Sequence, residues 1–216
     1  KVAAAAPERR PDLVVITSSY EGANLAASRV TLPSRDRADL LPMAQSLYAR
    51  EGMLPLGLAT YVLYYNCDWL RDLGYVADAA TLSDTVNTAC AATDLQGGQT
   101  GMGIPSQPMA MLALMTAGGE GEEHGDAAEA MTEIAQMLNA GCGQIYETHQ
   151  QANDRFSDGT LSLLPGSSLW WSAIAQAVNA EHKFTARAGA LPGPEGPGLS
   201  LWRGPACSTA IEDADP

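Results

Sequence analysis

The sequence predicts an α/β fold with a largely parallel sheet, and two observations support that prediction. Short, strongly apolar segments typical of strands alternate along the chain with longer segments typical of helices, as in α/β proteins. Of the 216 residues, 46% are hydrophobic and 17% are charged, which is the composition of a chain that buries a core. This length suits one large domain or two small ones.

Four segments have the pattern of strands. Residues 11–17 are rich in β-branched side chains after a Pro-Asp entry, and residues 53–66 form the longest apolar and aromatic stretch. Shorter strands are predicted over residues 160–164 and 184–191. The glycine-rich segment 97–103 lacks the lysine of a phosphate-binding loop, so it is predicted to be a flexible surface turn.

Helices are predicted between these strands, and capping residues mark several of their ends. Thr81 followed by Asp84 is close to a capping box for a helix over residues 82–92. Pro108 suits the first turn of a helix that continues to Met115. Further helices are expected over residues 68–74, 127–140, 148–156 and 168–178.

The charge balance and the cysteine count exclude several classes of function. Asp and Glu total 25 against 12 Lys and Arg, and the net charge of −13 disfavours nucleic acid and anionic membranes but allows a neutral ligand. The four cysteines and three histidines share no metal-ligand spacing, so no metal or other cofactor is expected. An even number of cysteines fits disulfides in an exported protein and equally fits thiols in the cytosol.

Two motifs invite a catalytic interpretation, and neither completes one. Residues 166–168, GSS, lie between a predicted strand and a predicted helix but lack the glycine that a nucleophile elbow needs after its serine. The acidic residues between 120 and 126 lie in a glycine-rich segment typical of a solvated turn. No catalytic residue is therefore expected. An α/β hydrolase or transferase with an unrecognised site is the alternative, and a structural or regulatory domain is a third hypothesis.

Trp170 and Trp171 are the aromatic residues of most interest for ligand binding. They are adjacent, so on a helix they point about 100° apart and are not expected to face one core together. The apolar face of a sugar ring fits an indole surface, which makes one of them a candidate stacking surface. Interdomain packing accounts equally well for either residue alone.

Several segments, in order along the chain, resemble the solute-binding proteins of bacterial ABC sugar importers, the maltose-binding-protein-like family. Residues 11–15, PDLVV, are similar to the strand that ends the family's first lobe segment. Residues 61–66, YVLYYN, followed by DWL, resemble its crossover strand. Further similar segments are TLSD at 81–84, FSDG at 156–159, GS at 166–167 and ALPG at 190–193.

The resemblance implies a type II periplasmic-binding-protein-like fold, with two lobes that close around a ligand in the cleft between them. It places a partial first lobe at residues 1–58, the second lobe at 59–190, and a return crossover toward the first lobe at 191–216. The family's first strands and its long helical end have no counterpart here. We therefore expect this chain to be an internal portion, with one lobe incomplete.

The resemblance also implies the function: an ABC transporter component that captures a small solute, a carbohydrate being the expected one, and delivers it to the membrane permease. Such a protein is expected to be a monomer outside the cytoplasm, tethered by a lipid anchor not present in this chain. Ser19, Tyr20 and Ala59 stand where maltose-binding members carry charged residues, which argues against the same ligand. The implied ligand-binding residues are Ser18, Ser19, Tyr20, Thr60, Tyr61, Gln107, Met109, Ser168 and Trp170.

A disulfide between Cys90 and Cys142 follows from the same resemblance. Each cysteine lies at the end of a predicted helix, and in this fold both helices belong to one lobe, which can bring the thiols within bonding range. Cys67 and Cys207 would both lie near the lobe crossover, and their pairing is left open.

Overall fold

The computed structural model describes residues 13–16, 45, 54–55, 58–75, 81–94, 96–106, 108–116, 127–180, 183–192, 197–198, 200–203 and 206–209. The chain divides into two compact units. One comprises residues 1–59 with 202–216, and the other comprises residues 60–201.

In the first unit, three short strands form an antiparallel sheet. β1 (Leu13–Ile16) pairs with β11 (Ala206–Thr209), and β11 also pairs with β2 (Leu54–Pro55). The register places Leu13 opposite Thr209, so the two ends of the sequence contribute neighbouring strands. β1 lies within the strand predicted over residues 11–17.

The second unit is built around a sheet in the order β10-β3-β6-β4-β5, and β7 also pairs with β3. Its strands are β3 (Leu58–Asn66), β4 (Thr100–Pro105), β5 (Gly143–Tyr146), β6 (Leu161–Ser167), β7 (Ala186–Gly189) and β10 (Ser200–Arg203), with a separate pair β8 (Leu191–Pro192) and β9 (Pro197–Gly198). The α/β class is confirmed.

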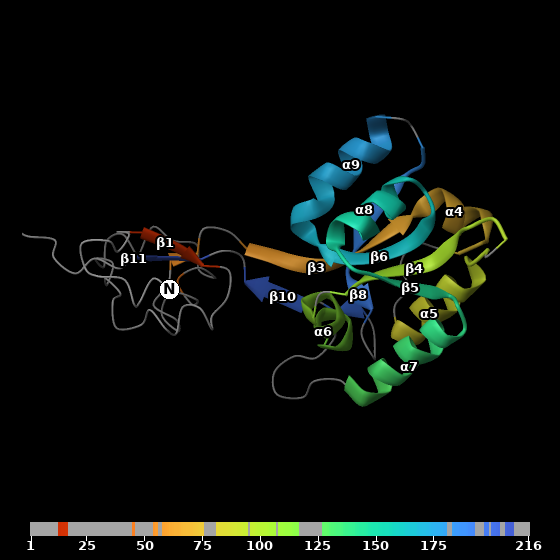
Figure 1. Ribbon diagram of the computed structural model, residues 1–216, viewed down its shortest axis with the longest axis horizontal. Coiled ribbons are helices and arrows are strands. Elements are labelled where there is room, and N and C mark those ends of the chain that lie inside the picture. The colour runs from red at the N-terminus through yellow and green to blue at the C-terminus, as the bar shows by residue number, and fades with distance from the viewer. Residues whose placement is uncertain are drawn as a thin grey trace, which may run out of the picture. The chain divides into compact units, whose positions relative to one another are not determined.

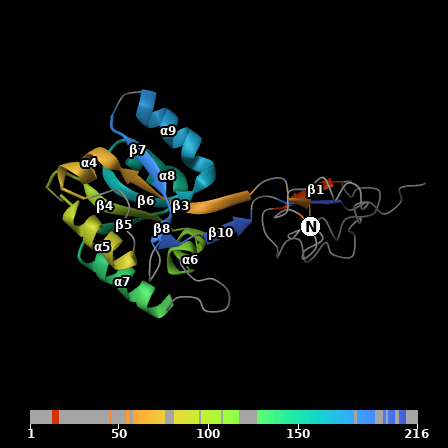
Figure 2. The ribbon, with the colours of Figure 1, turned by 180° about the vertical axis from the view of Figure 1, so that it is seen from behind.

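Helices cover both faces of this sheet (Figure 1), and the view from behind shows the same layers (Figure 2). α8 (His149–Ser157) and α9 (Trp171–Ala180) lie on one face, and α5 (Leu82–Ala91) and α7 (Ala127–Asn139) lie on the other. The other helices among the described residues are α4 (Cys67–Asp72), α6 (Pro108–Thr116) and the 3₁₀ turn η3 (Ser168–Trp170). Among the described residues, no helix is both long and apolar enough to span a bilayer.

The prediction of a largely parallel sheet is wrong, because the sheet is mixed. β4 is parallel to β5 and to β6, but β3 is antiparallel to both β6 and β7. The connection from β3 to β4 contains two helices, α4 and α5, and it returns the chain to the edge where β3 ends. A single crossover helix would have produced a parallel pair.

The glycine-rich segment 97–103 is also not the flexible surface turn that its composition predicts. The turn is short, and Thr100 begins β4, a central strand whose residues are buried from Gly101 onward. A side chain at residue 101 would place its Cβ 1.8 Å from the carbonyl oxygen of Ala89. Glycine is needed here because α5 packs directly on the strand backbone, and not because the segment must bend.

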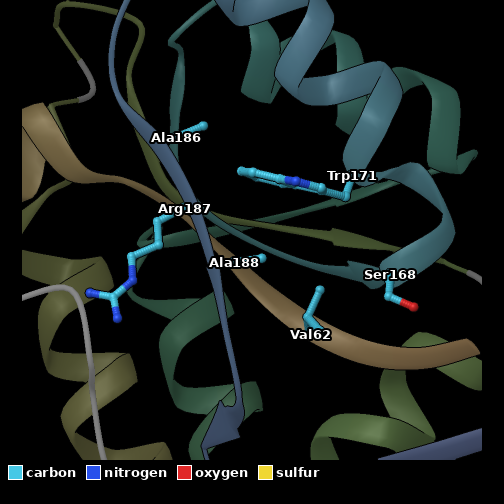
Figure 3. A pocket seen from close by; sticks show the side chains of 6 residues that line it. All are labelled: Val62, Ser168, Trp171, Ala186, Arg187 and Ala188. Carbon is cyan, nitrogen blue, oxygen red and sulfur yellow. The ribbon is translucent and has the colours of Figure 1, made fainter.

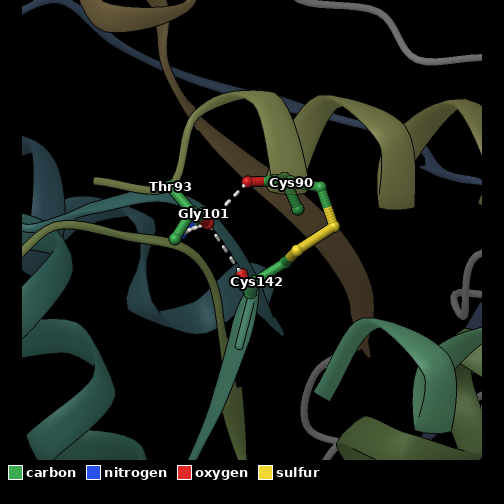
Figure 4. The surroundings of a disulfide bond; sticks show 5 residues. Cys90, Thr93, Gly101 and Cys142 are labelled. Carbon is green, nitrogen blue, oxygen red and sulfur yellow. Dashed lines mark hydrogen bonds between the residues drawn. A yellow bond between two sulfur atoms is a disulfide. The ribbon is translucent and has the colours of Figure 1, made fainter. Parts of the chain in front are cut away.

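Cys90 and Cys142 form a disulfide, which confirms the predicted bond (Figure 4). It joins the end of α5 to the residue before β5. Thr93 supports the junction, because its Oγ1 lies 3.3 Å from the carbonyl oxygen of Cys142 and accepts the N–H of Gly101 at 3.0 Å. The pairing of Cys67 with Cys207 stays open, because the side chain of Cys207 lies outside the described part of the structure.

α4 is attached to the segment that precedes β7 by two bonds to Thr185. The carbonyl oxygen of Thr185 accepts the N–H of Cys67 at 2.9 Å, and Asp68 Oδ2 accepts the N–H of Thr185 at 2.6 Å. Asp68 also forms an ion pair with Arg71 at 2.8 Å. The backbone N–H of Thr185 is the main reason that the pKa of Asp68 is lowered, and Arg71 adds to the effect.

Replacing both Cys90 and Cys142 by Ala is expected to destabilise the protein. The cysteines are 52 residues apart, and loop-closure entropy for that separation amounts to about 4 kcal/mol in the chain-entropy estimate. Urea unfolding followed by circular dichroism measures the change, and Cys67→Ala, which leaves the disulfide intact, is the control. Equal stability of the double variant and the native chain would contradict the role given to this bond.

Asp68→Asn is expected to destabilise the protein at neutral pH, on the order of 1 kcal/mol, through the lost charge-assisted hydrogen bond. The folded-state pKa of Asp68 is lowered, so its contribution is complete above the unfolded value near 4 and is lost as pH falls through the folded value. The gap between variant and native chain should therefore shrink in urea titrations at pH 3.5 relative to pH 7. Asp72→Asn, at the end of the same helix, is the matched control; a gap independent of pH would refute the argument.

Candidate functional site

The carboxyl ends of three strands meet at one edge of the sheet in the second unit. β4, β5 and β6 are mutually parallel, so all three end at this edge. β3 runs against β6, with Tyr61 opposite Ser167, so β3 begins at the same edge. Ligands of open α/β sheets bind outside the carboxyl ends of strands, which makes this edge the candidate site.

Thr60 and Ser168, 108 residues apart, are joined at this edge. The backbone N–H of Thr60 donates to Ser168 Oγ at 3.1 Å, and both residues are partly exposed. Both were predicted ligand-binding residues, and the structure brings them together. Their bond places the start of η3 beside the start of β3.

Tyr64 stabilises the turn after β6 from within the core. Its hydroxyl donates to the carbonyl oxygen of Ser167 at 2.6 Å, and burial raises the pKa of this phenol. The ring also restricts the residue at position 166, because a Cβ at Gly166 would lie 2.9 Å from Tyr64 Cε2. Gly166 therefore makes room for the ring that fixes the site.

Trp170 and Trp171 differ in how they face the core, as expected for adjacent helical residues. The buried hydrophobic cluster of the second unit consists of Tyr64, Tyr146, Ala152, Phe156, Leu161, Leu164, Ile174 and Val178. Trp170 packs against this cluster, and its ring centroid lies 6.3 Å from that of His149, whereas Trp171 is 37% exposed and stacks on Tyr64. Trp170 ends the 3₁₀ turn and Trp171 begins α9, and adjacent side chains point about 100–120° apart in either type of helix. Trp170 remains partly exposed, two residues after Ser168 in the sequence.

Tyr61, the third predicted residue described at this edge, has a different environment. It is 3% exposed, and burial raises the pKa of its phenol. Side chains alternate along a strand, so Tyr61 lies on the opposite face of the sheet from Thr60. Its side chain belongs to the interior under the edge.

Four other predicted ligand-binding residues fall outside the described residues: Ser18, Ser19, Tyr20 and Gln107. Met109 is placed as the second residue of α6, which begins just after β4 at the same edge. Its side chain lies outside the described part of the structure.

Two further residues lie at this edge that are not among the predicted ligand-binding residues, Ser106 and His149. Ser106 follows β4, its hydroxyl donates to the carbonyl oxygen of Glu147 at 2.9 Å, and its N–H donates to that of Tyr146 at 2.7 Å. His149 begins α8 just after β5, is 8% exposed, and has its pKa lowered by burial, which favours the neutral ring. Ser106 follows β4 and His149 follows β5, two strands that were not predicted because each contains glycine.

The chemistry of this edge is that of neutral hydrogen-bonding groups. Its described members supply hydroxyls, main-chain groups and an imidazole, and the pKa shifts of His149, Tyr61 and Tyr146 arise first from burial. Within the described ranges, no cluster of three His, Cys, Asp or Glu side chains could hold a metal ion. Such a surface suits binding of a neutral polar molecule.

Solved structures with the same fold cover nearly all of this chain. It aligns with the GacH receptor of Streptomyces glaucescens, solved unliganded and with acarbose, at 15% identity and a TM-score of 0.74, covering 96% of this chain and 58% of that one. It aligns with the substrate-binding protein Lmo0181 of Listeria monocytogenes, in complex with cycloalternan, at 15% identity and a TM-score of 0.72, covering 95% of this chain and 58% of that one. With UgpB of Mycobacterium tuberculosis, in complex with glycerophosphocholine, the identity is 16% and the TM-score is 0.74, and the alignment covers 95% of this chain and 57% of that one.

The chain thus spans a little under three fifths of the length of these structures, whose fold it shares: that of type II periplasmic binding proteins. A search of curated protein sequences finds no significant match. The family profile described as "bacterial extracellular solute-binding protein" matches residues 1–210, nearly the whole sequence. The chain belongs to the family of bacterial extracellular solute-binding proteins.

Proposed function

We propose that this protein captures a small neutral solute, a carbohydrate, and delivers it to the permease of an ABC importer without chemical conversion. The observation that supports this most directly is the bond between Thr60 and Ser168. It joins two hydroxyl-bearing residues at an edge where ligands of this fold class bind. Hydroxyl and main-chain groups are the partners that sugar hydroxyls need.

The structural relatives favour a carbohydrate over other neutral solutes. Their ligands include α-D-tagatose and raffinose. Glycerophosphocholine in UgpB shows that the same fold also serves a different kind of solute. The net charge of −13 disfavours anionic solutes here, because it lowers the local concentration of anions.

In this proposal the two units are the two lobes, with residues 1–58 in the first, 59–190 in the second and 191–216 returning toward the first. The implied residues Ser18, Ser19, Tyr20, Gln107 and Met109 would add to the described edge. The protein would act as a monomer outside the cytoplasm, tethered through a lipid anchor. An oxidising compartment agrees with the disulfide between Cys90 and Cys142.

The alternative of an α/β enzyme gains no support from this edge. A hydrolase or transferase needs a nucleophile with a base, or an acid with a base, in hydrogen-bonding range. His149 is the one described histidine here with a shifted pKa, and burial is the cause, not a carboxylate neighbour.

Titration with a panel of mono- and oligosaccharides is expected to change the intrinsic tryptophan fluorescence saturably for at least one sugar, because Trp170 lies next to Ser168. The same sugar at 100 times its Kd should stabilise the protein by about 2.7 kcal/mol in urea unfolding. Glycerophosphocholine is included as a non-sugar solute. A folded protein that responds to glycerophosphocholine and to no sugar would contradict the carbohydrate assignment.

Ser168→Ala is expected to weaken binding of that sugar about tenfold, which corresponds to about 1.4 kcal/mol. The variant removes one hydroxyl and leaves the Thr60 N–H without its acceptor. Calorimetric titration gives the Kd, and Ser172→Ala, an exposed serine on α9, is the matched control. An unchanged Kd in the Ser168 variant would remove this residue from the site.

A further inference from the structure

A pocket of about 430 Å³ lies in the second unit, beside the candidate site (Figure 3). It is an open pocket bordered by β3, β7, η3 and the start of α9. The lining residues are Val62, Ser168, Trp171, Ala186, Arg187 and Ala188. Its volume lies in the range of small-molecule sites, about 300–1,000 Å³.

Two alanines create this space. Ala188 lies opposite Tyr64 and Ala186 lies opposite Asn66 in the register of β7 and β3. Both alanines are partly buried and pack with Val62 against the hydrophobic cluster under α9. A larger apolar side chain at either position would occupy the volume that now lies beside the indole of Trp171.

The orientation of the Trp171 ring is fixed without a ligand. Its ring stacks on Tyr64, with 6.0 Å between ring centroids and 9° between planes, and Tyr64 is itself fixed by its bond to Ser167. Trp171 is still 37% exposed, and it, not Tyr64, lines the pocket. A ring entering the pocket would therefore meet an indole whose orientation is already set, which lowers the entropic cost of binding.

The walls contain no charge that points inward. In Figure 3 the guanidinium of Arg187 points away from Trp171, and the Ser168 hydroxyl also points away. Ser168 Oγ is engaged by the Thr60 N–H. A charged ligand would lose its hydration without compensation, whereas an aromatic ring would add a partner to the existing stack.

We propose that this pocket binds a flat, uncharged aromatic ring of one or two fused cycles, stacked on Trp171 above Val62 and the two alanines. The pocket shares Ser168 with the candidate carbohydrate site, but the proposal rests on Trp171 and the two alanines, and its test uses no sugar.

The test compares 2-naphthol with its saturated counterpart 2-decalol at pH 6.5, by calorimetry and by the indole N–H signals in ¹⁵N NMR, with the Trp171 signal assigned from Trp171→Phe. We expect 2-naphthol to bind at least tenfold more tightly than 2-decalol and to shift the Trp171 signal. Ala188→Leu should weaken 2-naphthol binding at least tenfold. Ala177→Leu, the same change at an exposed position of α9, should leave it within twofold.

Ala186→Leu fills the pocket from the other alanine, so the test does not depend on one variant folding. Equal affinity for 2-naphthol and 2-decalol would overturn the preference for an aromatic ring. Absence of binding, or binding that survives both Ala186→Leu and Ala188→Leu with native near-ultraviolet circular dichroism, would overturn the site itself.

Discussion

Tyr64 can occupy the interior only because residue 166 is glycine and leaves room for its ring. The packing of the second unit depends on this contact between Tyr64 and Gly166. The ring contacts Phe156 and Trp171, and its hydroxyl reaches the end of β6. A fully buried phenol needs a hydrogen-bond acceptor, and the carbonyl oxygen of Ser167 supplies it. One side chain thus fixes the sheet, the start of α9 and the turn that carries Ser168. Tyr64 therefore supports both the hydrophobic core and the edge that carries the candidate site.

Helices were easier to predict than strands, because helix ends carry side-chain signals. Thr81 caps α5 by accepting the N–H of Asp84, and the helix over residues 127–140 was placed to within one residue. β4 and β5 were missed because each contains or begins with glycine, a residue whose usual meaning is a turn. Here glycine reflects how closely an adjacent segment packs, as Gly101 against Ala89 does. That distance is set by tertiary structure and leaves no local pattern.

The same limit applies to the candidate site. Thr60 and Ser168 could be named because resemblance placed them at strand ends, but a bond across 108 residues is not visible in either local sequence. Ser106 and His149 are not among the ligand-binding residues that the resemblance implied, and the strands that precede them were not predicted. The bonds at this edge run largely through main-chain groups, including the N–H of Thr60 and the carbonyl oxygens of Tyr146, Glu147 and Ser167. Any sequence supplies these groups, so the scaffold persists at 15% identity while ligands differ.

The disulfide also limits how far this chain can be stretched. It closes a loop that contains β4, α6 and α7. Tension applied to the chain outside this loop is carried by the disulfide and not by the residues inside the loop. The 52-residue separation removes about 180 Å of extendable length, at roughly 3.5 Å per residue. Members of a bacterial extracellular family meet shear and proteases outside the cytoplasm. There, the disulfide restricts unfolding under tension to the residues outside the loop.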